Sequence, residues 1–92
     1  MMQNLRFLHA CQNAPAFDIY DNGILLIQWL KMYEYTEYIS VLSGIHKITI
    51  YVAGTKKNPV ISKKFRVLPG TSTTIMIGGS LQTIYIKKKT RV

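Results

Sequence analysis

The stretch that decides the fold is LHACQNAPAFDIYDNG, residues 8–23. Asn22 and Gly23 lie between two short apolar segments, and Asn-Gly is the strongest short hairpin signal because both central positions of a type I′ turn need positive φ. Upstream, Pro15 fixes its own φ and favours an extended conformation at Ala14. The stretch therefore predicts the end of one strand, a change of direction and a second strand that begins a hairpin.

Short apolar segments separated by turn residues continue to the end of the chain. In residues 45–52, Ile48 and Ile50 alternate with Lys47 and Thr49, the period of two that is typical of a strand with one buried face. Turn residues recur at short intervals throughout. This pattern predicts an all-β fold, a small antiparallel β-sandwich of about seven strands.

Residues 23–38 fit two interpretations. A short helix is one alternative, because helical spacing relates Leu26, Trp29, Leu30 and Tyr33. We favour a strand, because the Asn-Gly turn requires a returning partner, and we expect the aromatic segment KMYEYTEY to be a crossover between strands.

The composition describes one basic domain, residues 1–92, with 12 Lys and Arg against 4 Asp and Glu and a formal net charge of +8. Such a balance favours anionic partners, among them nucleic acid and acidic polymers. The single cysteine excludes an intramolecular disulfide. The longest apolar run is too short for a membrane span. No export signal is visible, which by sequence alone predicts a cytoplasmic location.

Basic residues are concentrated in the second half of the chain. If the strands that carry Lys64 and Lys87 share a sheet, their outer face is a positive stripe that ends in a flexible basic tail, residues 87–92. A stripe of this kind would hold polyanions in a salt-dependent way. The alternative is that these lysines only aid solubility and protect sheet edges. The candidate polyanion-binding residues are Lys56, Lys57, Lys64, Arg66, Lys87, Lys88, Lys89 and Arg91.

Four aromatic residues gather in and before the expected crossover. Exposed aromatic clusters are typical of protein or sugar contact surfaces, because they bury a large area at low entropic cost. Alternatively, they close one end of the sandwich. The candidate contact residues are Trp29, Tyr33, Tyr35 and Tyr38. This patch, or an open strand edge, predicts self-association into a homo-oligomer.

His9 and Cys11 raise the question of a reactive pair. In a strand they share a face with Leu5 and Phe7. A thiolate–imidazole pair would need an open face and a third group that orients the ring, and the sequence offers neither. We therefore predict a histidine hydrogen-bonded to backbone beside a buried thiol.

The sequence predicts no catalytic, cofactor-binding or metal-binding residues, and so no enzyme. The four carboxylates lack recognised ligand spacing, and we expect that of Asp21 to cap its own turn. No phosphate-binding loop or dinucleotide fingerprint is present.

Three segments resemble the bacterial domain of unknown function 4397 family in order and spacing. They are residues 5–23 (LRFLHACQNAPAFDIYDNG), residues 38–55 (YISVLSGIHKITIYVAGT), and NPVIS followed by LPGTSTTIMIGG. The resemblance implies an immunoglobulin-like or transthyretin-like sandwich, usually in secreted or cell-surface bacterial proteins and without established activity. This chain differs in its single copy, its lack of a visible export signal and its basic later strands.

These observations predict a non-enzymatic binding or structural module that presents a β-sandwich surface for protein or polymer contact. The resemblance alone adds a cell-envelope or spore-associated location. The alternative is a soluble protein that binds nucleic acid or an acidic polymer through its basic face and tail. The nucleic-acid signal is weak, because the sequence has neither an RNP-type aromatic pair nor a groove-reading helix.

Overall fold

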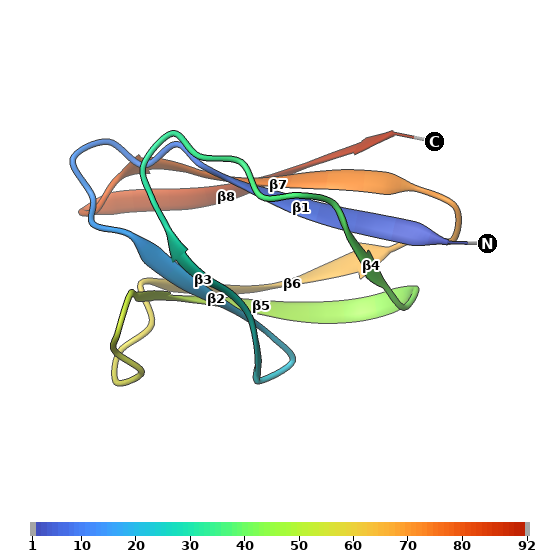
Figure 1. The fold of residues 1–92 in the computed structure, drawn as a ribbon, viewed down its shortest axis with the longest axis horizontal. Helices are drawn as coiled ribbons and strands as arrows, with labels where there is room; N and C mark the ends of the chain where they lie inside the picture. The colour runs from blue at the N-terminus through green and yellow to red at the C-terminus, as the bar shows by residue number, and fades with distance from the viewer. Residues whose placement is uncertain (1, 92) are drawn as a thin grey trace.

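The computed structural model describes residues 2–91 and contains eight strands. They are β1 (Gln3–His9), β2 (Phe17–Asp21), β3 (Ile24–Leu30), β4 (Ile39–Val41), β5 (Gly44–Val52), β6 (Ile61–Val67), β7 (Ser72–Ser80) and β8 (Thr83–Arg91). They form two four-stranded sheets, ordered β4-β1-β7-β8 and β3-β2-β5-β6, which lie one above the other in Figure 1. The small all-β sandwich is confirmed, with one strand more than the approximate count.

Pairing between neighbouring strands is antiparallel with one exception. β1 and β7 are parallel, from Asn4 opposite Ser72 to His9 opposite Ile77. A parallel pair cannot be closed by a short turn. Here the chain between β1 and β7 forms β4 and all four strands of the second sheet. The exception places β1, the first strand of the chain, beside β7, the last strand but one (Figure 1).

The predicted β2–β3 hairpin is present. Its central residues, Asn22 and Gly23, have φ values of 51° and 85°. The side-chain Oδ1 of Asn22 also accepts a hydrogen bond from Lys47 N at 2.8 Å, which ties the turn to β5. The returning segment is strand β3, and residues 31–38 after it form an irregular crossover without a helix.

Strand alternation places one face of each strand between the sheets. In β1, Leu5 and Phe7 are fully buried, whereas Arg6 and Leu8, which alternate with them, are partly exposed. The buried apolar residues are Leu5, Phe7, Cys11, Phe17, Ile19, Leu30, Ile48, Ile50, Phe65, Val67, Ile75, Ile77 and Ile86. Because this core determines which face of each strand is inside, it also determines which side chains are presented outward.

His9 and Cys11 are both fully buried, as predicted. Cys11 N donates to Nδ1 of His9 at 3.2 Å, so Nδ1 is an acceptor and Nε2 carries the proton donated to the Pro15 carbonyl at 2.9 Å. The ring stacks on Phe17 with centroids 4.2 Å apart. Burial raises the pKa of the Cys11 thiol. The two residues therefore stabilise the first turn, and neither has the surroundings of a reactive group.

Asp21 differs from expectation. Its carboxylate accepts a hydrogen bond from Nδ1 of the buried His46 at 2.8 Å, rather than capping its own turn. The reason is strand register, because Asp21 lies beside β5 on the inward-facing side, close to the ring of His46.

The predicted basic stripe and tail also need correction. Lys64 and Arg66 lie on β6 in one sheet, whereas Lys87 lies on β8 in the other, so no single sheet carries all three. Residues 87–91 are the second half of β8 and pair with β7 up to Arg91 opposite Ser72. Backbone pairing with β7 orders this segment. Residue 92 lies outside the described residues.

Candidate anion-binding groove

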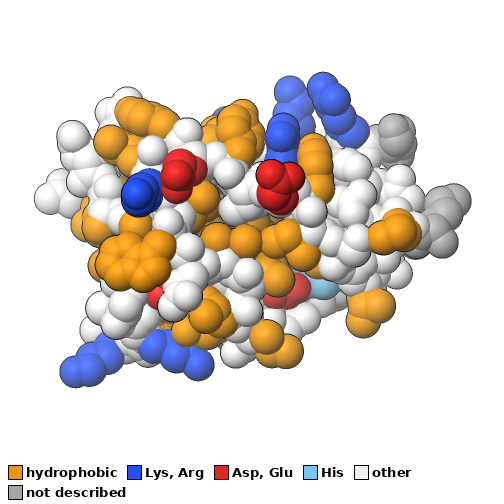
Figure 2. Space-filling view, in the orientation of Figure 1, with side chains coloured by type: hydrophobic (Ala, Val, Ile, Leu, Met, Phe, Trp, Pro, Cys, Tyr) orange, Lys and Arg blue, Asp and Glu red, His pale blue; other side chains and the backbone are white. Residues whose placement is uncertain are grey.

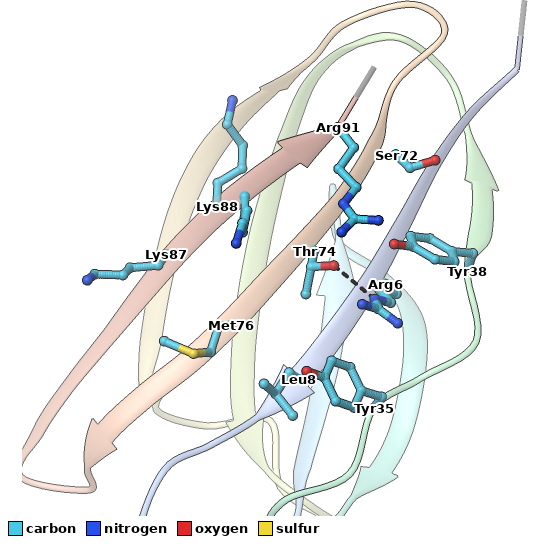
Figure 3. Close-up of a pocket in the computed structure, with 11 residues that line it drawn as sticks. Arg6, Leu8, Tyr35, Tyr38, Ser72, Thr74, Met76, Lys87, Lys88 and Arg91 are labelled. Carbon is cyan, nitrogen blue, oxygen red and sulfur yellow. Dashed lines mark hydrogen bonds between the residues drawn. The ribbon is translucent and has the colours of Figure 1, made fainter.

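The outer face of the β4-β1-β7-β8 sheet carries a groove of about 460 Å³. Sheet register builds it in rows, with Arg6 beside Thr74 and Thr74 opposite Lys89. In the next row Leu8 lies beside Met76, and Met76 lies opposite Lys87. The groove is lined by Arg6, Leu8, Tyr35, Tyr38, Ser72, Thr74, Met76, Lys87, Lys88, Lys89 and Arg91 (Figure 3).

Arg6 lies near the centre of the groove. Its guanidinium carbon is 4.5 Å from the centroid of the Tyr35 ring and 4.8 Å from that of Tyr38. Its Nε donates to Thr74 Oγ1 at 2.8 Å (Figure 3). Two cation–π contacts and one hydrogen bond therefore orient the group. This is its only hydrogen bond to residues 2–91, so its terminal NH₂ groups keep their donors for a ligand.

The crossover that supplies the two tyrosines is attached to β1. Thr36 N donates to the Phe7 carbonyl at 2.8 Å, and Phe7 N donates back to Thr36 Oγ1 at 2.9 Å. Leu8 and Tyr35 form an isolated antiparallel bridge. The crossover thus extends this side of the sheet beyond the three residues of β4 and brings Tyr35 to the outer face.

Within residues 2–91, no carboxylate forms an ion pair with the basic side chains of the groove. The ion pair between His46 and Asp21 is the only one among residues 2–91. Asp18 accepts backbone hydrogen bonds from Trp29 N and Gly54 N, and Glu34 Oε1 accepts one from a backbone N–H. In Figure 2, Lys and Arg side chains gather at opposite margins of the molecule, above the first sheet and near the β5–β6 loop. An anion is therefore the ligand that the electrostatics favour.

The candidate polyanion-binding residues lie in separate places. Half of them line the groove, namely Lys87, Lys88, Lys89 and Arg91. The groove therefore brings half of the candidate basic residues together with two of the four candidate aromatic residues, Tyr35 and Tyr38. Lys88 also donates from Nζ to the Arg66 carbonyl at 3.1 Å, connecting β8 to β6. The others, Lys56, Lys57, Lys64 and Arg66, are not among the groove residues.

Trp29 and Tyr33 also lie outside the groove. Their side chains are 57% and 63% exposed, and Tyr35 and Tyr38 are exposed as well, so the four aromatic residues do not close the end of the sandwich. Trp29 and Tyr33 have positive φ values of 57° and 67°. The hydrogen bond from Trp29 N to Asp18 Oδ1, 2.9 Å, stabilises the first of these conformations.

Sequence reasoning missed the central residue, Arg6. The alternation of residues 5–9 already places Arg6 and Leu8 on the face opposite Leu5 and Phe7, which is a usable signal. No comparable signal in the sequence indicates that Thr74 and Met76 lie beside Arg6 and Leu8. That contact depends on the parallel pairing of β1 with β7.

Residues 2–91 contain no group of three or more His, Cys, Asp or Glu side chains arranged to hold a metal ion. Over the same residues, no helix has the length and apolar character needed to cross a membrane.

Comparisons with known proteins give one result for the whole domain. No curated protein matches the chain significantly. A family model matches residues 3–89, including every strand that builds the groove up to Lys89. The chain therefore belongs to the family described as "Domain of unknown function (DUF4397)".

Proposed function

We propose that the protein is a non-enzymatic binding module whose groove holds an acidic polysaccharide. One observation carries the proposal: Arg6 is oriented by two tyrosines and Thr74, yet its terminal donors have no partner among residues 2–91. A preoriented guanidinium matches a carboxylate or sulfate group, which it can bind through two hydrogen bonds.

The rest of the groove suits a charged sugar chain. Lys89 and Arg91 supply further positive charge beside Arg6. Hydroxyl groups of Ser72 and Thr74 lie on the same outer face and can exchange hydrogen bonds with sugar hydroxyls. Other lining residues, Leu8 and Met76 among them, are apolar and suit the C–H faces of sugar rings.

Nucleic acid fits the groove less well. Proteins that bind single strands stack bases on free aromatic faces. Here Arg6 lies over the rings of both Tyr35 and Tyr38, so those ring faces are already occupied. This favours the polysaccharide over the nucleic acid.

The proposal is tested with three probes over a salt series: polygalacturonate, neutral dextran and a single-stranded oligonucleotide. We expect the protein to bind polygalacturonate more tightly than the oligonucleotide, and dextran not at all. The variant Arg6→Gln should weaken polygalacturonate binding more than Lys57→Gln, which removes one positive charge outside the groove. Equal losses in the two variants would indicate only diffuse charge attraction. Tighter binding of the oligonucleotide would reverse the choice of ligand, and failure to bind either polyanion would overturn the proposal.

Self-association is a second candidate function, and the β3 edge favours it. β3 is an outer strand whose sequence, ILLIQWL, contains no charge, and Ile24 on it is 72% exposed. The outer strands β6 and β8 carry several lysines, which oppose edge pairing. Sedimentation should show a concentration-dependent dimer that Ile24→Lys abolishes. Monomers at every concentration would refute it. A place in a cell-envelope or spore-associated layer is suggested only by the family resemblance.

A further inference from the structure

A second surface with similar chemistry lies on the opposite sheet. It is a smaller hollow, of about 260 Å³, on the outer face of β3-β2-β5-β6. Its lining includes Tyr20, Lys47, Thr49, Tyr51, Lys56 and Ser62. None of these residues belongs to the first groove.

The side chains of this hollow are arranged much as in the groove. Lys56 Nζ lies 4.7 Å from the centroid of the Tyr20 ring, which in turn packs edge-on against Tyr51 at 5.3 Å. The hydroxyls of Thr49 and Ser62 are hydrogen-bonded at 3.0 Å across β5 and β6. A cation over a tyrosine beside a pair of hydroxyls is thus present on both faces.

A pair of like charges beside the hollow points independently to an anion. Lys47 on β5 lies directly opposite Lys64 on β6, and both side chains are exposed. Like charges at directly opposed positions destabilise a sheet. No ion pair among residues 2–91 compensates either lysine. An acidic group bound between them would remove the repulsion.

The two surfaces face away from each other. The sheets are stacked, and the molecule measures 22 and 20 Å across its two shorter axes (Figure 1). A short ligand segment in the groove cannot reach the hollow. Each surface is therefore open to a different segment of polymer.

We propose that the module is bivalent: it binds one acidic polysaccharide segment on each sheet and thereby cross-links two chains. This inference rests on the proposed function of the groove. Linking two weak sites in one rigid body raises the apparent affinity for a long polymer without any new contact. The proposed function of the groove does not require the hollow to bind a ligand.

A nuclear magnetic resonance titration with trigalacturonate, a ligand shorter than the sandwich is wide, tests the two sites separately. We expect backbone amide shifts around Thr74 and Lys89 and, independently, around Thr49 and Lys64. Lys87→Gln/Lys89→Gln should remove only the first set, and Lys47→Gln/Lys64→Gln only the second. The matched control Lys31→Gln/Lys57→Gln loses the same charge outside both surfaces and should keep both sets.

Light scattering with long polygalacturonate measures cross-linking directly. Scattering by the wild type should pass through a maximum at a defined ratio of protein to polymer and fall in protein excess. Scattering should stay near baseline for each of the two double variants, Lys87→Gln/Lys89→Gln and Lys47→Gln/Lys64→Gln. Shifts confined to the groove, or scattering that survives in Lys47→Gln/Lys64→Gln as in the control, would overturn bivalency and leave the groove proposal standing. Absence of all shifts and of all scattering would overturn both. Spectra of the free variants verify that each one is folded.

Discussion

Two side chains of one strand show the contrast between structural and ligand-facing polar groups. His9 and Arg6 lie three residues apart on β1, on opposite faces of the sheet. Both ring nitrogens of His9 are hydrogen-bonded to the first turn, whereas Arg6 uses one of its three nitrogens. A polar side chain whose groups are all used by the fold stabilises it. A polar side chain that the fold orients, but whose donors it does not all use, can bind a ligand.

The largest effect is expected where the fold uses the polar group completely. His9→Leu keeps the volume roughly similar but leaves Pro15 O and Cys11 N without their partner inside the protein. An unpaired buried group such as Cys11 N costs about 1–3 kcal/mol, and loss of the hydrogen bond to the partly buried Pro15 carbonyl adds about 1 kcal/mol. We therefore expect the free energy of unfolding to fall by about 2–4 kcal/mol in urea denaturation. Asn4→Ala on the same strand removes only a surface hydrogen bond and should change it by less than about 0.5 kcal/mol. Similar losses of stability in His9→Leu and Asn4→Ala would contradict the contrast between buried and surface polar groups.

The second buried histidine extends the comparison to the other sheet. Both nitrogens of His46 lie within hydrogen-bond distance of acceptors, the Asp21 carboxylate at 2.8 Å and the Leu42 carbonyl at 2.6 Å. Asp21→Asn replaces the carboxylate by a neutral amide and so removes the charged partner of the ring. Because hydrogen bonds to charged groups contribute about 1.5–3 kcal/mol, we expect a loss of that size in denaturant titrations, with the groove's affinity for polygalacturonate unchanged. A stability equal to that of the wild type would show that the pair contributes nothing.

Cys11 gives a smaller, pH-dependent effect. An unfolded thiol has a pKa of about 8.5, and burial raises the pKa of Cys11 in the fold. The native state therefore keeps the neutral form, and the resulting stability is complete below about pH 8.5 and is lost as the pH rises above it. The decline should not exceed about 1.4 kcal/mol per pH unit.

Cys11→Ala, compared with the wild type in urea at each pH, isolates this contribution from the titration of lysines and tyrosines. We expect the two stability curves to converge as the pH rises above about 8.5. Parallel curves would show that burial does not perturb the thiol.

The smallest effect on folding is expected on the outer face. Arg6→Lys keeps the charge but loses the planar group held between Tyr35 and Tyr38. Stability should change by less than about 0.5 kcal/mol. Affinity for polygalacturonate should fall by about two- to tenfold, the equivalent of roughly 0.5–1.5 kcal/mol for the lost geometry. Unchanged affinity would show that only the charge of Arg6 matters.

Local patterns predicted much of the fold. Asn22-Gly23 specified its hairpin through backbone φ, and alternation placed Ile48 and Ile50 inside and Lys47 outside. Most of the candidate site was not predictable in this way. The lysines of β6 and β8 look alike in sequence, yet they belong to different sheets. The same limit applies to Tyr35, whose place beside Arg6 depends on the crossover attaching to β1.

By itself the sequence determined the strands, the first hairpin, the buried face and an excess of positive charge, because φ preferences and period-two alternation act between near neighbours. Tertiary structure alone decided that Arg6 lies beside Thr74 and Tyr35, and that two cationic surfaces face opposite directions. Both depend on pairings between distant segments, above all the parallel pair of β1 and β7. Such pairings are selected by the burial of the whole core, a property that no short stretch of sequence carries.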